Sequence, residues 1–296
     1  MTGKEHDDHL RQGIKVSPVT SALAGSISGL VARMFTAPLD VVKIRLQLQV
    51  SGDKYDGILQ TMKLIAKEEG VLALWKGNVP AAVMYVLYGA AQFSSYTVYN
   101  NWLTDFEQQY KLRIGPASHS FILGSAAGCT STLISYPFDL LRTRFASEPT
   151  FSKLSSTLRS IHHHEGPSAF FKGVNTAMLS ISLYTGLMFW SYEVSRSISS
   201  KINIYQPVVE PVCGFAAGVF AKSIVFPLDL IRRRLQVNRS RNKNFIITAL
   251  NVVKVEGLRG LYKGFFVSII KNAPTTAISI WTYEHVLRLY KEEVIS

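Results

Sequence analysis

The stretch PLDVVKIR at residues 38–45 decides the fold, because the chain contains it three times. It returns as PFDLLRTR at residues 137–144 and as PLDLIRRR at residues 227–234. Each copy, which we call the proline motif, places an acid two residues after a proline and a base three residues after the acid. The prolines are 99 and 90 residues apart, and this near-constant spacing indicates three copies of one structural unit.

A second pattern begins 28 to 31 residues after each of these prolines. It consists of an acid, a glycine, four further residues, an aromatic residue, a lysine and a glycine, and we call it the glycine motif. Its copies occupy residues 69–77, 165–173 and 256–264. Two glycines spaced four residues apart also precede each proline motif, as small residues do where membrane helices pack closely.

Each unit contains a long apolar segment, a short amphipathic segment and a second long apolar segment. We expect long helices at residues 17–47, 79–103, 117–146, 174–200, 208–236 and 265–290. Each is long enough to cross a bilayer, which takes about 20 residues. We expect short helices at residues 55–67, 154–164 and 245–255. The predicted fold is an all-α membrane protein whose six transmembrane helices form three pseudo-symmetric repeats around a central cavity. The repeats are predicted at residues 16–110, 115–204 and 207–296, within one membrane domain.

Composition limits the possible partners. The mean hydropathy is +0.15, a middle value that suits helices facing lipid on one side and water on the other. The net charge of +12 favours nucleic acid, an anionic membrane surface or an anionic solute. The sequence has no zinc spacing, RNA-binding signature or helix-turn-helix pattern, so we expect no nucleic-acid partner. It has no nucleophile–base constellation, phosphate loop or paired catalytic carboxylates, so we expect no enzyme, no bound cofactor and no metal site.

The two motifs, repeated three times, resemble the mitochondrial carrier family over essentially the whole chain. The resemblance implies a solute transporter of the mitochondrial inner membrane that works by alternating access. An even number of spans puts both termini on one side. The loops that carry the short helices are rich in lysine and arginine, so the positive-inside rule places them in the matrix. We therefore expect three amphipathic matrix helices and both termini in the intermembrane space.

The charges of the proline motif are candidates for a gate. In a ring of three helices, each acid can meet the base of the next repeat. The resemblance implies that these pairs close the matrix side. It also implies a bracing glutamine nine residues after each proline, which repeats 1 and 3 have, whereas repeat 2 has Ala146 there. The alternative, ordinary helix-end charges, fits three copies in register poorly. The expected matrix-gate residues are Asp40, Lys43, Asp139, Arg142, Asp229, Arg232, Gln47 and Gln236.

The resemblance implies a second gate on the cytoplasmic side, built from a tyrosine, an acid and a base on the second helix of each repeat. Only repeat 2 keeps the whole pattern, since Thr97 and Asn100 replace both charges in repeat 1 and Leu287 replaces the base in repeat 3. We expect a gate held mainly by packing and tyrosine hydrogen bonds. Its residues are Tyr96, Tyr192, Glu193, Arg196, Tyr283 and Glu284.

Cations within the predicted spans are candidates for a substrate site, because a charge at the bilayer centre costs about 2.5–3.5 kcal/mol to insert. Arg33 and Lys222 each lie seven residues before a proline-motif acid, with Thr132 at the equivalent place in repeat 2, and Lys271 lies in the last span. For Arg33, the alternative is that the side chain extends to the membrane surface. Three cations in one cavity favour a solute with concentrated negative charge, such as a diphosphate.

The resemblance also implies substrate contacts seven and eight residues after the last glycine of each glycine motif. Ser180 and Ile181 leave flat space for a heteroaromatic ring, and Tyr85 and Tyr88 could stack on such a ring or, alternatively, pack against other helices. The expected substrate-binding residues are Arg33, Thr132, Lys222, Met84, Tyr85, Ser180, Ile181, Lys271 and Asn272.

Within the family, the resemblance is strongest to members that carry thiamine pyrophosphate, on residues 75–81, 88–93 and 135–144. It implies import of this solute, as a substrate rather than a cofactor, in exchange for another phosphorylated anion. The residues themselves indicate only a phosphorylated anion that bears a ring. Two alternative functions remain. One is a carrier of nucleotides or coenzyme A, and the other is a proton-leak or non-transporting membrane protein. The expected partners are the solute and the bilayer, with cardiolipin on the matrix side. Because one chain suffices to form a cavity, we expect a functional monomer.

Overall fold

A computed structural model describes residues 18–50, 54–111, 115–149, 154–201, 206–238 and 244–295. These residues form six long helices and three short ones, which confirms the predicted all-α class. The long helices are α2 (Pro18–Leu48), α4 (Asn78–Tyr110), α5 (Pro116–Ser147), α7 (Val174–Lys201), α8 (Gln206–Val237) and α10 (Phe265–Ile295). The short helices are α3 (Ile58–Glu69), α6 (Leu154–Glu165) and α9 (Phe245–Gly260).

The largest difference from the expected bounds is at α4, which continues seven residues beyond residue 103. Trp102, Phe106 and Tyr110 follow one another at four-residue spacing, with ring centroids 6.1 and 4.6 Å apart. Aromatic contacts along one helix face therefore extend the helix through a polar segment that hydropathy alone would end.

Hydropathy marks only two of the six helices that are predicted to span the membrane. By length and composition, two described helices are apolar enough to cross a membrane, Val71–Tyr110 and Val212–Val237, with mean hydropathies of 1.3 and 1.6. Large apolar side chains are nevertheless exposed along the long helices, including Phe93 at 80%, Trp102 at 68% and Phe215 at 65%. Such exposure is unfavourable in water and favourable in lipid, so these faces suit a bilayer.

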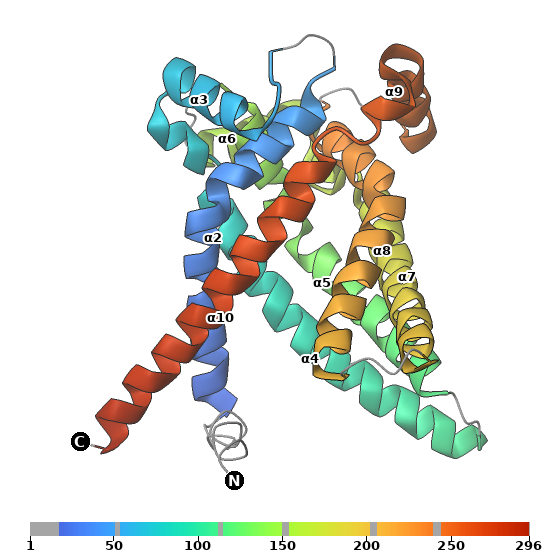
Figure 1. The fold of residues 1–296 in the computed structure, drawn as a ribbon. Coiled ribbons are helices and arrows are strands. Elements are labelled where there is room, and N and C mark those ends of the chain that lie inside the picture. Colours follow the sequence, from blue (N-terminus) through green and yellow to red (C-terminus); the bar gives the residue numbers. More distant parts are fainter. Residues whose placement is uncertain are drawn as a thin grey trace. The chain divides into compact units, whose positions relative to one another are not determined.

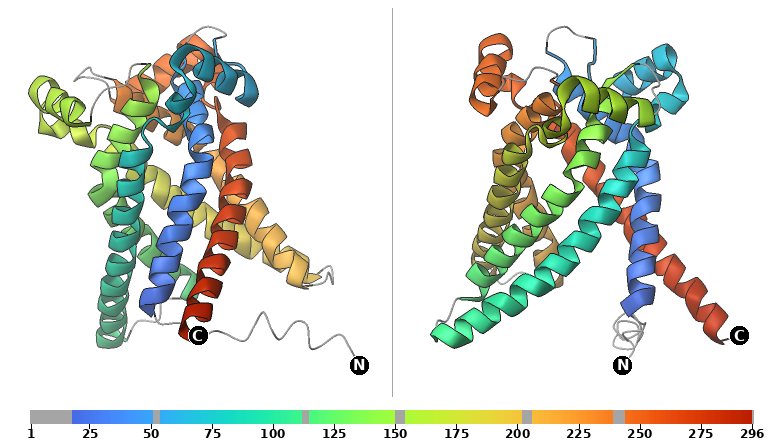
Figure 2. Two further views of the ribbon diagram at one scale, coloured as in Figure 1. Left: turned by 90° about the vertical axis from the view of Figure 1, so that its left-hand side faces the viewer. Right: turned by 180° about the vertical axis from the view of Figure 1, so that it is seen from behind.

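The chain divides into two compact units, residues 1–36 with 272–296, and residues 37–271. The first unit contains most of α2 and α10, and Ser28 and Ser279 face each other there with hydroxyl oxygens 3.5 Å apart. In the second unit, α4 packs along α5 and α7 packs along α8 (Figure 1). The short helices all lie at the same end of these four long helices, with α9 on the opposite side from α3 (Figure 2).

The short helices α3 and α6 use their apolar faces to cover the first and second proline motifs. Ile65 of α3 is 1% exposed and packs with Val41 and Val42, which lie inside the first proline motif. Ile161 of α6 packs in the same way with Leu140 and Leu141 of the second. The apolar residues between the motif's charges are thus buried.

Glycine at the end of each glycine motif is required by conformation and by space. Gly77 has a φ of 78°, and a Cβ atom there would lie 2.6 Å from the carbonyl oxygen of Arg142. Gly173 and Gly264 have φ values of 82° and 80°, and a Cβ atom at either would lie 3.3 Å from a side chain on α8 or α2, respectively. A side chain would separate each of these turns from the helix of the next repeat.

Each glycine motif is also joined to the proline motif of its own repeat by ion pairs to a largely buried glutamate, which the sequence analysis did not identify. In every repeat, one glutamate accepts from the last arginine of the proline motif and from the lysine before the final glycine. The pairs are Arg45–Glu69 at 2.9 Å, Lys76–Glu69 at 2.6 Å, Arg144–Glu165 and Lys172–Glu165 at 2.5 Å, Arg234–Glu256 at 2.9 Å and Lys263–Glu256 at 2.5 Å.

The effect of these pairs is visible at Glu165. Burial raises the pKa of its carboxyl, but hydrogen bonds from Arg144 and Lys172 outweigh burial and lower the pKa to about 2. Burial also raises the pKa of Glu256, but hydrogen bonds from Arg234 and Lys263 outweigh burial and lower it. Both glutamates are therefore ionised wherever the protein is folded near neutral pH.

Candidate functional site

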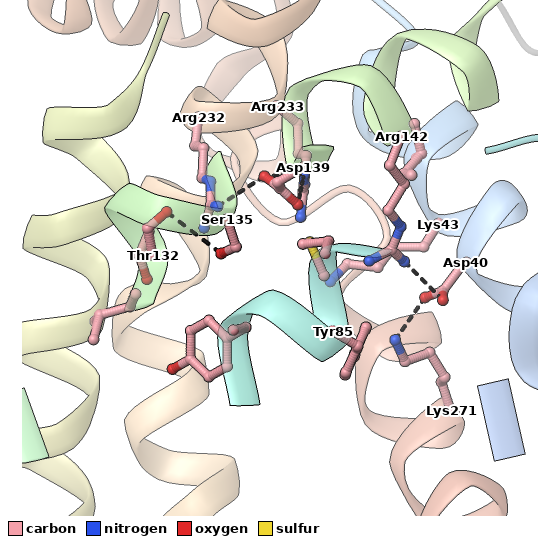
Figure 3. Close-up of a pocket in the computed structure, with 14 residues that line it drawn as sticks. Asp40, Lys43, Tyr85, Thr132, Ser135, Asp139, Arg142, Arg232, Arg233 and Lys271 are labelled. Carbon is pink, nitrogen blue, oxygen red and sulfur yellow. Dashed lines mark hydrogen bonds and ion pairs between the residues drawn. The ribbon is translucent and has the colours of Figure 1, made fainter. Parts of the chain in front are cut away.

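A cavity of about 270 Å³ lies among the proline motifs, inside the unit of residues 37–271 (Figure 3). All six long helices contribute to its wall. The lining residues are Asp40, Lys43, Ile44, Met84, Tyr85, Tyr88, Thr132, Ser135, Asp139, Arg142, Ile181, Arg232, Arg233 and Lys271. Five of them are cationic and two are acidic, so the wall carries an excess of three positive charges. Such a wall favours an anion with more than one negative charge.

Asp40 joins two of the cations. Its carboxylate accepts from Arg142 at 2.7 Å and from Lys271 at 2.5 Å, and Asp40 is 5% exposed (Figure 3). The pair with Arg142 is the contact expected between the acid of repeat 1 and the base of repeat 2. Lys271 is the cation expected in the substrate site, so one carboxylate links a gate base to a site base.

Asp139 joins two others. Arg232 donates to Asp139 at 2.7 Å, as expected for the acid of repeat 2 and the base of repeat 3. Arg233 also reaches this carboxylate, with its Nη1 atom 3.0 and 2.9 Å from the two oxygens (Figure 3). Gln236 donates to Asp139 at 2.7 Å and accepts from Thr143 at 2.8 Å, so this glutamine braces the pair.

The third expected pair, Asp229 with Lys43, does not occur within the described residues. Asp229 is paired with Lys222 instead. Lys222 lies seven residues earlier on α8, two turns away on the same face, so a long side chain reaches the carboxylate without any help from a neighbouring helix. Two consequences correct the sequence analysis. The three motif pairs are not equivalent, and Lys222 and Lys271 both have carboxylate partners.

The two glutamines expected to brace the pairs also differ. The side chain of Gln47 is completely buried, and among the described residues neither its amide oxygen nor its amide nitrogen has a hydrogen-bond partner. Gln236 is equally buried and has partners for both atoms. The glutamine is thus satisfied where an acid–base pair is formed beside it and unsatisfied where the pair is missing.

The residues expected to contact substrate fall into three groups. Met84, Tyr85, Thr132, Ile181 and Lys271 line the cavity. Ser180 is buried outside the lining, and Lys222 is held by Asp229. Arg33 is 6% exposed and, with Asn272, belongs to the unit of residues 1–36 and 272–296.

The expected cytoplasmic-gate residues are described only in part. Tyr96 on α4 is 43% exposed and Tyr192 on α7 is half-buried. The side chains of Glu193 and Arg196 lie outside the described residues. Tyr283 is half-buried and Glu284 is exposed, both in the unit of residues 1–36 and 272–296. The contacts expected among these six residues therefore stay predictions.

Sequence reasoning missed three lining residues, Ile44, Ser135 and Arg233. For Arg233, a signal was present. The third proline motif ends in three consecutive arginines, where the first two copies have Ile44 and Thr143 in the middle place. An additional cation at that position adds charge to one repeat alone. Ile44 and Ser135 are ordinary helix residues and carry no comparable signal.

Comparison with known proteins agrees with this architecture. A sequence model of the family described as "Mitochondrial carrier protein" matches residues 15–107, 115–203 and 205–294. Proteins named "Mitochondrial thiamine pyrophosphate carrier 1" are similar over nearly the whole chain. The protein from Lodderomyces elongisporus is 47% identical over 298 residues, covering 97% of this chain and 96% of its own. That from Candida albicans is 45% identical with 97% of both chains covered, and that from Yarrowia lipolytica is 40% identical with 96% of both covered.

Proposed function

The chain belongs to the mitochondrial carrier family, and from this premise we propose that it imports thiamine pyrophosphate into the mitochondrial matrix. The solute is a transported substrate, bound without chemical conversion, and the protein is a transporter rather than an enzyme. The observation that carries the proposal is the excess of three positive charges on a cavity wall that also contains two tyrosines.

The charge excess suits the diphosphate. Lysine ammonium groups and arginine guanidinium groups are the preferred partners of phosphate oxygens. Lys271 and Arg142 share one carboxylate, so both have donors to offer to a second anion. A solute with a single carboxylate would leave most of the excess unbalanced.

The tyrosines suit the rest of the molecule. Tyr85 and Tyr88 line the same cavity as the cations. Thiamine pyrophosphate has a positively charged thiazolium ring next to its diphosphate, and a cationic ring is attracted to the face of an aromatic side chain. A wall that carries both cations and aromatic rings therefore offers partners to the diphosphate and to the neighbouring ring.

Transport proceeds by alternating access, in exchange for another phosphorylated anion. The basic loops that carry α3, α6 and α9 face the matrix and both termini face the intermembrane space. The pairs of Asp40 with Arg142 and of Asp139 with Arg232 close the matrix side. Residues on the second helix of each repeat close the cytoplasmic side.

The lipid partner is cardiolipin on the matrix side. A second cavity lies where α7 and α9 begin, lined by Gly173, Val174, Asn244 and Phe245 among others. Backbone N–H groups at helix starts favour phosphate. The substrate cavity is lined by one chain, which supports function as a monomer.

Uptake into liposomes reconstituted with the purified protein tests the function. We would offer labelled thiamine pyrophosphate, thiamine monophosphate, an adenine nucleotide, coenzyme A and a keto acid, with and without an internal counter-substrate. We expect preferred uptake of thiamine pyrophosphate, stimulated by an internal phosphorylated anion and lost in Lys271→Met. Lys63→Met, on the exposed face of α3, is the matched control. Preferred uptake of a nucleotide or coenzyme A would overturn the choice of solute, and keto acid uptake would overturn the diphosphate site.

A further inference from the structure

We propose that Tyr136 is a positioning residue of the matrix gate, and that the face of its ring holds the guanidinium group of Arg232 opposite Asp139. Phe226 serves Lys43 in the same way. The proposal deepens the proposed function and rests on it for the existence of a gate that opens and closes, while the contact between ring and cation can be tested without transport.

The first observation is the contact itself. The guanidinium carbon of Arg232 lies 5.2 Å from the ring centroid of Tyr136, within the range at which an aromatic face attracts a cation. The same guanidinium group donates to Asp139 at 2.7 Å (Figure 3). Arg232 is thus held by a carboxylate and by a ring.

The second observation concerns the remaining donors of Arg232. Its Nε atom is buried and, among the described residues, has no hydrogen-bond partner. A buried N–H group without an acceptor is unfavourable, and an aromatic face is a weak substitute for one. The ring of Tyr136, which is 0% exposed, therefore gives this buried cation a favourable neighbour where no polar acceptor is present.

The third observation is the spacing of ring and acid. Tyr136 precedes Asp139 by three residues, so the two side chains lie on one face of α5, about one turn apart. The base of the following repeat, Arg232, meets both of them. In repeat 1 the equivalent residue is Ala37, so Arg142 meets no ring at that place. The gate is therefore unequal in its aromatic residues.

The arrangement recurs in repeat 3. Phe226 precedes Asp229 by three residues, and the Nζ atom of Lys43 lies 5.9 Å from the ring centroid of Phe226. Lys43 occupies this place although Asp229 is bonded to Lys222 in this structure. The ring thus keeps the base beside the helix of its acid while the acid has another partner. A gate needs this property, because its bases must stay in place while a pair is broken.

The two rings are themselves fixed by the glycine motifs. Tyr136 stacks on Phe171, with ring centroids 6.4 Å apart and planes at 10°, and its hydroxyl donates to the carbonyl oxygen of Lys172 at 2.8 Å. Phe226 stacks on Tyr262, with ring centroids 6.2 Å apart. The aromatic residue of the glycine motif therefore sets the orientation of the ring that faces the gate base.

The consequence concerns the rate of transport. When the pair of Asp139 with Arg232 breaks, Arg232 loses the carboxylate and keeps the ring, so the pair re-forms without a search for the right side-chain conformation. The described residues that line the cavity do not include Tyr136. The ring should therefore raise the maximal rate and leave the affinity for the solute unchanged.

A double-mutant cycle on the melting temperature of the purified protein tests the contact. Tyr136→Leu replaces the ring by an aliphatic side chain and is combined with Arg232→Met. We expect strong non-additivity, and near-additivity in the matched cycle with Arg142→Met. Tyr136→Phe should retain the coupling, because it removes only the hydroxyl that bonds to Lys172. Equal coupling to both arginines, or loss of the coupling in Tyr136→Phe, would overturn the proposal.

Fluorinated phenylalanines at position 136 separate the charge distribution of the ring from its shape, and they serve even if Tyr136→Leu folds poorly. Each added fluorine makes the ring face less negative. We expect the melting temperature to fall stepwise from phenylalanine to trifluorophenylalanine in the presence of Arg232 and to stay constant in Arg232→Met. The same series at the exposed Phe215 of α8 is the control. A constant melting temperature with Arg232 present would overturn the proposal.

Initial-rate uptake into liposomes tests the positioning role. We expect Tyr136→Leu to lower the maximal rate of thiamine pyrophosphate uptake by about fivefold or more with a KM within about twofold of the wild type, and Tyr136→Phe to behave as the wild type. The fluorinated series should lower the rate in the same order as the melting temperature. A raised KM with an unchanged maximal rate would overturn the proposal. Absence of thiamine pyrophosphate uptake by the wild type would instead overturn the proposed function, and the melting-temperature cycle distinguishes the two failures.

Discussion

Arg234 in repeat 3 donates a hydrogen bond from Nε to the backbone carbonyl oxygen of Gln47 in repeat 1, at 3.1 Å. The same atom of Arg45 reaches the carbonyl of Ala146 at 2.6 Å, and that of Arg144 reaches the carbonyl of Gln236 at 2.9 Å. Each arginine thus satisfies a carbonyl at the C-terminal end of the first helix in the next repeat, where helices leave acceptors unpaired. The contact from Arg234 to Gln47 closes the cycle of three repeats.

Removing Arg234 should open this cycle. Arg234→Ala removes the bond to Gln47, the bond to the carbonyl of Gln49 at 3.2 Å and one of the two cationic partners of Glu256, which keeps Lys263. Each buried carbonyl that loses its donor costs about 1–3 kcal/mol, and the ion pair with Glu256 is weakened, so we expect a large fall in the melting temperature of the purified protein. Arg259→Ala, an exposed arginine on α9, is the control. Equal melting temperatures for the two variants would refute the structural role of the cycle.

The two glutamines after the proline motifs should respond oppositely to methionine, which has a similar volume and no hydrogen-bonding groups. Gln236→Met leaves Asp139 and Thr143 without bonds that they now make, and it should lower the free energy of unfolding by about 1–3 kcal/mol. Gln47→Met removes a buried amide that has no partner within the described residues, so it should be neutral or stabilising. Chemical or thermal unfolding in detergent measures both, and a comparable loss at Gln47 would contradict the difference between them.

Gly77→Ala should be strongly destabilising because space and conformation both oppose it. Its Cβ would lie 2.6 Å from the carbonyl oxygen of Arg142, on a backbone with φ of 78°. We expect a loss of about 1–3 kcal/mol from overpacking, in addition to the backbone strain. Gly89→Ala is the control, since Gly89 lies inside α4 with nothing within 4 Å of the added atom. That variant should be neutral or slightly stabilising, because alanine favours helix.

The ion pairs of Glu165 predict a pH dependence of stability. The pKa of Glu165 is about 2 in the folded protein against an ordinary value of 4.5. Because the folded pKa is the lower one, the stabilisation is complete above pH 4.5 and is lost as the pH falls from there toward about 2. The melting-temperature difference between the wild type and Glu165→Gln should thus be constant from pH about 7 to about 5 and smaller at pH about 3. A difference that stays constant down to the lowest pH would show that the charge of Glu165 contributes nothing.

The repeated sequence by itself determined the fold class of the protein. Three proline motifs and three glycine motifs specify helices whose bounds depend on local chemistry, namely proline spacing, apolar run length and glycine at positive φ. The same local patterns placed Asp40, Asp139, Arg142, Arg232 and Lys271 on faces that meet. Periodicity within a helix is a property of neighbouring residues, so the sequence alone could predict it.

The choice of partners was decided only by the tertiary structure. The sequence contains two lysines at suitable positions for Asp229, Lys43 in the next repeat and Lys222 on its own helix, and the repeated motif favours Lys43. The folded chain pairs Asp229 with Lys222 and seats Lys43 beside Phe226. The folded chain also brings Arg233 to Asp139. It places Arg234, the last arginine of the third proline motif, against the carbonyl of Gln47 in the next repeat. The contacts of Arg233 and Arg234 join segments about 90 to 190 residues apart, and such distances exist only once the helices are packed against one another.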